Sequence, residues 1–330
     1  MKYSLPAIAL ILAFHTASAQ GGSGFTLSRT FTIGSPGGWD YIAVGPDKKI
    51  YVSHGTQVNI LDQQTGDSMG VIPNTTGVHG IAFDAGGKGY TSNGRLNTVT
   101  VFDVKTAGIL SQIATGQNPD AILYEPFTKT IITCNGRSHD LSVIDPVKGQ
   151  VIATIALDGK PETAVSDEKG RIYVNIEDKN KITAVDMRTN AVIASYPLGA
   201  EGPTGLAIDT KTKRLFAGCD KKLVVMDAAT GAIVSTLPIG DGCDGVGFDA
   251  GLSLVFASCG EGKLTVIKES SPSSFAVIDN VPTKRSARTI AVDGITHAVY
   301  LPAADTEPGA AGERPKTIPG TFGVLVVKRP

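Results

Sequence analysis

The sequence repeats one short pattern at an almost constant interval. Each copy is a run of apolar and β-branched residues that ends at a charged residue, namely Asp62, Asp103, Asp145, Asp186, Asp227 and Lys268. Successive copies lie 41, 42, 41, 41 and 41 residues apart. Each interval holds four short apolar runs separated by Gly, Asp and Asn, which is the pattern of strands joined by tight turns. A period of about 40–45 residues with four strands per unit is typical of the blades of a β-propeller.

The seventh unit of the repeat is incomplete, because it stops at its third strand, residues 322–328. The missing fourth strand has a counterpart at the other end of the chain, where residues 25–34 (FTLSRTFTIG) align with residues 231–240 (GAIVSTLPIG). Pairing the N-terminal strand with the last blade would close the ring and remove its open strand edges. We therefore predict an all-β fold, a seven-bladed β-propeller with four-stranded blades, in which no helix is needed.

The Asp that ends each third strand is expected to shape a turn. Four residues after it stands Gly or Asn in most units, as at Gly66, Gly149, Asn190 and Gly231. These residue types suit a position with positive φ in a hairpin. We interpret the repeated Asp as structural rather than catalytic.

The N-terminus and the composition indicate an exported protein. Residues 1–19 have the pattern of a secretory signal peptide, in which Lys2 precedes an apolar run over residues 5–14 and Ala17-Ser18-Ala19 completes the segment. We predict a periplasmic or secreted protein in which residues 20–330 form one domain, without a membrane span. The 30 basic and 31 acidic residues nearly balance, so nucleic acid is not indicated as a partner. We expect a monomer.

One blade also carries a family resemblance. The segment RIYVNIEDKNKITAVDMRTNAVIASYPLG, residues 171–199, resembles the YVTN-type repeat of bacterial YncE-like propellers. A group within that family shares segments matched here by GWDY at Trp39, SHGT at Ser53, TSNGR at Thr91 and YVNIED at Tyr173. The resemblance covers the whole chain after the signal segment and implies the propeller fold. It does not imply an activity, because fold alone does not dictate function.

Propeller topology brings one residue from each blade to the mouth of the central channel. The innermost strands start at one face, here called the top face, and their first residues are Asp40, His79, Asp120, Glu162, Thr204, Asp244 and Arg288. These seven residues are here called the ring residues. Four of them are carboxylates. Their mutual repulsion favours a bound cation, raised pKa values or pairing with Arg288. A hydrated polar funnel is the structural alternative.

Further polar residues are expected near the ring on the top face. The second strands end at His54, Asn93, Cys134, Asn175, Cys219 and Cys259. Two Asn-Gly-Arg triplets then place Arg95 and Arg137 in corresponding loops of blades 2 and 3, where guanidinium groups could hold an anionic ligand. The alternatives are structural hydrogen bonding by the histidines and turn stabilisation by the arginines. The predicted ligand-binding residues are His54, His79, Arg95, Arg137, His139, Asp40, Asp120 and Arg288.

Three functions are compatible with such a surface. The first is binding of a small molecule, a metal ion or a partner protein at the channel mouth, without chemistry. The second is a divalent-metal-dependent enzyme, because lactonases of the gluconolactonase group and streptogramin lyases are similar propellers with a metal at the channel. The third is a scaffold for protein contacts. In the enzyme, His79 would be the base, and the metal would be held through oxygen ligands by Asp40, Glu162, Asn175 and Asp244.

The cysteines and an insertion complete the candidate features. A disulfide is permitted in an exported chain, and the candidates for one are Cys219, Cys243 and Cys259, with Cys134 left free. Blade 7 carries an insertion, DTEPGAAGERPKTIPG, between its second and third strands. Its Pro, Gly and charge content favours a mobile segment without a core of its own, placed to act as a flap over the channel mouth.

Overall fold

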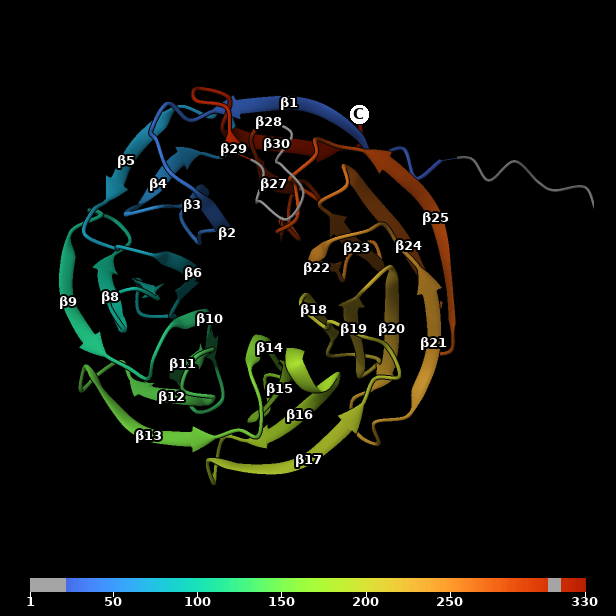
Figure 1. Ribbon diagram of the computed structural model, residues 1–330, viewed down its shortest axis with the longest axis horizontal. Helices are drawn as coiled ribbons and strands as arrows, with labels where there is room; N and C mark the ends of the chain where they lie inside the picture. The colour runs from blue at the N-terminus through green and yellow to red at the C-terminus, as the bar shows by residue number, and fades with distance from the viewer. Residues whose placement is uncertain (1–21, 308–315) are drawn as a thin grey trace, which may run out of the picture.

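The computed structural model describes residues 22–307 and 316–330, which form seven four-stranded antiparallel sheets arranged as a ring around a central channel (Figure 1). The predicted signal segment lies outside the described residues. Blades 1 to 3 comprise β2 (Trp39–Val44), β3 (Lys49–His54), β4 (Gln57–Asp62) and β5 (Ser68–Ile72); β6 (Val78–Phe83), β7 (Lys88–Asn93), β8 (Thr98–Asp103) and β9 (Ile109–Ala114); β10 (Pro119–Glu125), β11 (Thr130–Asn135), β12 (Asp140–Asp145) and β13 (Gln150–Ala156).

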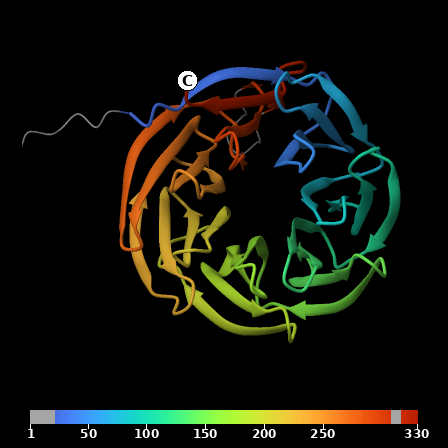
Figure 2. The same cartoon turned by 180° about the vertical axis from the view of Figure 1, so that it is seen from behind.

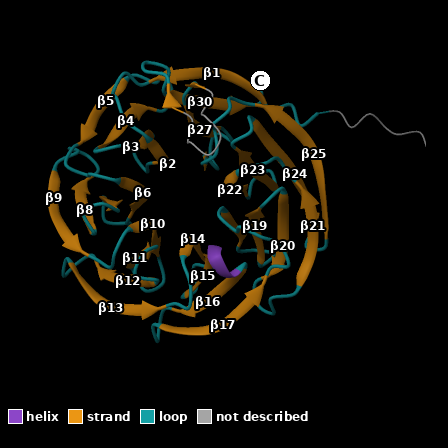
Figure 3. Ribbon diagram, viewed as in Figure 1, coloured by secondary structure: helices purple, strands orange, loops and turns teal. Residues whose placement is uncertain are grey.

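The remaining blades repeat this order from the channel outward. Blades 4 to 6 comprise β14 (Pro161–Ser166), β15 (Arg171–Ile176), β16 (Lys181–Asp186) and β17 (Ala191–Pro197); β18 (Leu206–Asp209), β19 (Arg214–Cys219), β20 (Lys222–Asp227) and β21 (Ile233–Pro238); β22 (Cys243–Asp249), β23 (Leu254–Cys259), β24 (Lys263–Ser271) and β25 (Ser274–Pro282). Blade 7 comprises β26 (Ala291–Val292), β27 (Val299–Ala303), β30 (Gly323–Lys328) and β1 (Thr26–Thr32). The seven-bladed all-β prediction is confirmed. Apart from a single 3₁₀ turn, η1 (Glu177–Lys179), the described elements are strands (Figure 3).

Blade 7 is completed by the N-terminal strand, as the alignment of the chain ends predicts. Strand β1 pairs antiparallel with β30 from Thr26 opposite Lys328 to Thr32 opposite Gly323. In views from the front and from behind, the blue N-terminal strand accordingly lies along the red C-terminal strand (Figures 1 and 2). Phe31 is packed in the apolar cluster between blades 7 and 1, whereas Phe25 belongs to the cluster between blades 6 and 7. The closing strand therefore contributes to two blade interfaces.

The hydrophobic core lies between successive blades rather than inside one of them. The second strands are buried on both faces, as in β11, where every residue from Thr130 to Asn135 is buried. The outermost strands face solvent, and in β9 a single residue, Ile113, is buried. The repeated Asp closes turns, as predicted: Asp62 Oδ1 accepts hydrogen bonds from the backbone N–H groups of Gln64 and Thr65, both at 2.8 Å.

The cysteines and the insertion are only partly as expected. All four cysteines are buried free thiols, so the disulfide considered among three of them is not formed, although Cys243 and Cys259 are directly opposite each other in β22 and β23. The insertion begins and ends as a two-stranded ribbon of β28 (Thr306–Glu307) and β29 (Lys316–Thr317). Its tip, on which the predicted flap depends, lies outside the described residues. Among the residues described, no helix is long and apolar enough to cross a bilayer.

The closing strand generates the first prediction. Phe31 is 4% exposed, whereas Leu27 on the same strand is 45% exposed. Phe31→Ala should lower the free energy of unfolding by about 3–5 kcal/mol, because it leaves a cavity between blades 7 and 1. Leu27→Ala is the matched control and should cost less than about 1 kcal/mol. Chemical denaturation measures both changes, and equal effects would contradict a stabilising role for ring closure.

Candidate functional site

A β-bulge places each of five ring residues at the channel mouth. In β2, Trp39 is opposite His54 but Ile42 is opposite Val52, so one extra residue is inserted at Asp40 and Tyr41. The same irregularity occurs at the ring residues of four other innermost strands, β6, β10, β14 and β22. A bulge interrupts the alternation of side chains and redirects them. The repeated bulge therefore explains how the ring residues of separate blades converge on one point.

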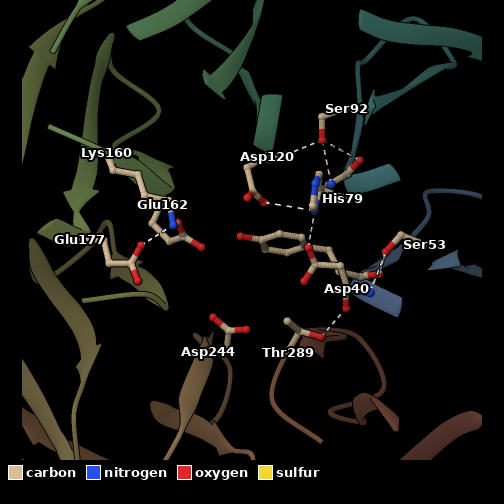
Figure 4. A network of polar contacts seen from close by, with 12 residues as sticks. Asp40, Ser53, His79, Ser92, Asp120, Lys160, Glu162, Glu177, Asp244 and Thr289 are labelled. Carbon is tan, nitrogen blue, oxygen red and sulfur yellow. Dashed lines mark hydrogen bonds and ion pairs between the residues drawn. The ribbon is translucent and has the colours of Figure 1, made fainter. Parts of the chain in front are cut away.

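Asp40 is the centre of an ionic network that joins five blades, and Figure 4 shows the part of it around His79 and Asp120. Its Oδ2 accepts a hydrogen bond from His79 Nδ1 at 2.6 Å, and its Oδ1 lies 3.2 Å from Arg288 Nη2. Arg288 also donates from Nε to Asp244 Oδ2 at 2.6 Å. His79 Nδ1 lies 3.7 Å from Asp120 Oδ1. The structure thus brings together five of the predicted ligand and metal residues.

Burial raises the pKa values of two other ring carboxyl groups. Burial, reinforced by the negative charge of Asp40, raises the pKa of Asp120 to about 6, although His79 opposes the shift. Burial and the charge of Asp120 raise the pKa of Glu162 to about 8, against the attraction of Lys160, whose Nζ is 3.1 Å from Glu162 Oε2. Both side chains are nearly covered, at 13% and 12% exposed. Both groups therefore favour the neutral form more than an exposed carboxyl group does.

The imidazole of His79 is held in a defined orientation by this network. Burial disfavours its charged form, but the hydrogen bond to Asp40 and the charge of Asp120 outweigh burial and raise the His79 pKa. Its other nitrogen, Nε2, lies against the loop between β7 and β8, where a Cβ on Gly94 would be 2.6 Å away. Within the described chain Nε2 has no hydrogen-bond partner.

Tyr41 is a member of the site that the sequence analysis missed. It belongs to blade 1 but packs against the apolar cluster between blades 3 and 4, so its ring extends across the channel. Burial raises the pKa of its hydroxyl well above the ordinary value, and the charges of Asp120 and Glu162 add to the effect. A signal was present in the sequence, because the residue after the ring residue is small in every other blade: Gly80, Ala121, Thr163, Gly205, Gly245 and Thr289.

A cavity of about 170 Å³ occupies the channel beside Tyr41. Its wall combines the small residues that follow the ring residues with a level of aliphatic side chains. The aliphatic lining residues are Ile42, Ile81, Ile122, Leu206, Val246 and Ile290. Asp244 also reaches this wall, so the cavity connects an acidic ring with an apolar interior.

Several predicted site residues lie apart from this network. His54 is 1% exposed, and both its ring nitrogens are engaged, by Ser35 Oγ at 2.7 Å and the Gly37 carbonyl at 3.0 Å. Asn175 is buried and donates from Nδ2 to the Thr204 and Gly205 carbonyls, both at 3.1 Å, so it ties blade 4 to blade 5. Three others are exposed on the top-face loops, namely Arg95, Arg137 and His139. No ion pair of these three occurs within the described ranges.

Lys160 and Glu177 join the site without having been predicted. Lys160 precedes the ring residue of blade 4 by two positions and pairs with both Glu162 and Glu177. Glu177 belongs to η1, the turn between β15 and β16. The four residues between β15 and β16 equal in number those of the corresponding turns of blades 2 and 3, so loop length in the sequence did not point to Glu177.

Comparison with solved structures supports the fold. The chain is similar to Kuenenia stuttgartiensis hydrazine synthase, with a TM-score of 0.70 and 14% identity over 80% of this chain and 92% of that one. It is also similar to the WD40 repeats of RRP9, with a TM-score of 0.78 and 9% identity over 91% and 96%, and to U3-55K, with a TM-score of 0.77 and 9% identity over 91% and 97%. No family model matches, and no curated protein is similar in sequence. At these identities the likeness establishes the propeller fold alone.

The raised pKa of Glu162 generates a pH-dependent prediction. A carboxyl group whose folded-state pKa exceeds its unfolded value stabilises the fold at low pH, and that stability is lost as the pH rises through the folded pKa. Ionisation of Glu162 should therefore destabilise the protein between about pH 4.5 and pH 8. We expect Glu162→Gln to be more stable than the wild type by at least about 1 kcal/mol at pH 8 and equal to it at pH 4.

Denaturation curves at the two pH values measure this difference. The matched control is Glu201→Gln, because Glu201 is exposed on the same face and its substitution should leave the pH dependence unchanged. A Glu162→Gln variant that is equally destabilised at both pH values would show that the carboxylate is needed for packing and is not strained by its charge.

Proposed function

We propose that the protein is an exported propeller that binds a positively charged ligand at the top-face mouth of its channel. The observation that supports this proposal most strongly is Asp120. Its Oδ1 is buried and accepts no hydrogen bond from any described residue, and the nearest cationic group is His79 at 3.7 Å. The permanent cations are already engaged, because Arg288 pairs with Asp40 and Asp244, and Lys160 pairs with two glutamates. A ligand cation would supply the missing counter-charge.

The proposal includes a family and a location. The YVTN-type segment of residues 171–199 supports assignment to the YncE-like propellers, and the pattern of residues 1–19 supports export to the periplasm or the outside. A small molecule would be bound by the channel and a protein partner by the rim. The clamp for an anionic group formed by Arg95 and Arg137 remains a prediction, and the cationic ligand proposed here does not require it.

A second candidate function is a divalent-metal enzyme. Ligand atoms of Asp40, His79 and Asp120 all lie within 4.8 Å of one another, which is compatible with one metal ion. This trio shares only Asp40 with the set expected from the sequence. Glu162 pairs with Lys160, Asp244 pairs with Arg288, and the Asn175 amide donates to backbone carbonyls of blade 5. In the alternative role of a base, His79 would act through Nε2, while Asp40 orients the ring through Nδ1.

Cation binding is tested by thermal denaturation of EDTA-treated protein with Ca²⁺, Mn²⁺, Zn²⁺ or an organic ammonium salt. At least one cation should raise the melting temperature of the wild type in a concentration-dependent way, because ligands of the folded state stabilise it. Asp120→Asn should abolish the shift, and Glu201→Gln should retain it. If instead citrate or phosphate stabilises the wild type and Arg95→Ala with Arg137→Ala removes the effect, the ligand is anionic and the proposal is wrong.

A further inference from the structure

The cavity in the channel has two features that a site for a bare metal ion does not need. One is its size, since a volume of about 170 Å³ exceeds the roughly 150 Å³ that suffices to bind benzene in a protein interior. The other is its aliphatic wall, to which Ile42, Ile81, Ile122 and Val246 contribute. An apolar wall beside an acidic ring is complementary to a molecule that has both a positive charge and an apolar body.

Tyr41 departs from the pattern of small residues at this level of the channel. The small residues at this level are required by the close approach of neighbouring inner strands: a Cβ on Gly80 would lie 2.8 Å from Ile122, and one on Gly205 would lie 2.7 Å from the backbone of Val246. In blade 1 the equivalent position instead carries a large aromatic side chain that crosses the channel. Its ring packs against the cluster between blades 3 and 4, which are the blades that carry Asp120 and Glu162.

Aromatic rings and carboxylates together are the groups that bind organic ammonium ions. The ring face attracts the cation electrostatically, and a carboxylate accepts charge-assisted hydrogen bonds from N–H groups. Asp120 is the ring carboxylate that no Lys or Arg of the described chain pairs with, and its Oδ1 lacks a donor. A primary ammonium group brings three donors, so it matches the acceptors that this part of the ring offers.

We infer that the channel binds a small primary ammonium ion with a compact apolar body, with the ammonium group at Asp120 and Tyr41 and the apolar body against the aliphatic wall. This inference rests on the proposed function, because it specifies which kind of cation the mouth accepts. Tyr41 is its specificity-determining residue, since it supplies the aromatic face and limits the length of the body that fits.

The test uses benzylammonium chloride as the probe and benzyl alcohol as its neutral counterpart, titrated calorimetrically into the full-length mature protein after EDTA treatment. Benzylammonium should bind at least about tenfold more tightly than benzyl alcohol, because the alcohol has no positive charge to pair with the Asp120 carboxylate. Equal affinities would overturn the inference, since they would indicate binding by the apolar wall alone. Parallel titrations with Ca²⁺, Mn²⁺ and Zn²⁺ distinguish a failure of this inference from a failure of the proposed function.

If a metal ion binds and benzylammonium does not, the inference is wrong while a cation site remains. If neither binds, both the inference and the proposed function are wrong. Tyr41→Ala should weaken benzylammonium binding at least about tenfold, whereas Tyr41→Phe, which keeps the aromatic face, should stay within about threefold of the wild type. Similar losses of benzylammonium affinity in both variants would show that the aromatic face does not contribute to binding.

A third variant keeps the test decisive if Tyr41→Ala fails to fold. Thr163 lines the same cavity from blade 4, and Thr163→Leu adds volume there without altering a carboxylate. It should abolish benzylammonium binding while leaving any metal binding at Asp40, His79 and Asp120 intact. Glu201→Gln, on the exposed surface, is the matched control and should bind as the wild type does. Retained benzylammonium affinity in Thr163→Leu would place the ligand outside the channel and overturn the inference.

Discussion

The pairing of β1 with β30 is the constraint on which both the fold and the site depend. It joins the first strand of the ring to the last, and it thereby fixes blade 7 against blade 1. Across that seam Arg288 reaches Asp40, which is 248 residues away in sequence, and Thr289 Oγ1 donates to the Asp40 carbonyl at 2.5 Å. The seam is further packed by Phe322, whose ring lies 5.1 Å from Trp39 and 4.2 Å from His54. Ring closure therefore also completes the ionic network.

The second constraint is the single extra residue in the innermost strands. A regular strand alternates its side chains between two faces, and in a propeller both faces of an inner strand lie against neighbouring blades. The bulges release the ring residues from this alternation. Where the strand starts later, as in blade 5, the equivalent residue Thr204 instead donates a hydrogen bond to the Cys243 carbonyl at 2.5 Å. The four ring carboxylates and His79 thus lie where the bulge is present, whereas Arg288 precedes β26, for which no bulge is found.

Much of the fold and part of the site could be predicted from the sequence, for identifiable physical reasons. A constant period positions residues along each strand, so it correctly located the ring residues and the closing strand. It does not give side-chain direction or the partners of a side chain. His54 and Asn175 both stand at the end of a second strand, where the repeat predicts ligand-binding side chains. In the structure the His54 ring is hydrogen-bonded to Ser35, and the Asn175 amide is hydrogen-bonded to the backbone of blade 5. Tyr41 was missed because a single aromatic residue does not repeat, and comparing its position across blades was the step required to find it.

The ionised carboxylates of the ring destabilise the folded state. Ionised carboxyl groups with little solvent access destabilise a fold unless cations or donors compensate them, and a ring made of Thr or Ser would avoid that cost. Arg288 and Lys160 compensate part of the charge, but they form ion pairs with other carboxylates and not with Asp120. Asp120 is left with His79, which it shares with Asp40, as its nearest cationic group. On the proposal of a cationic ligand, binding would therefore stabilise the channel mouth through Asp120.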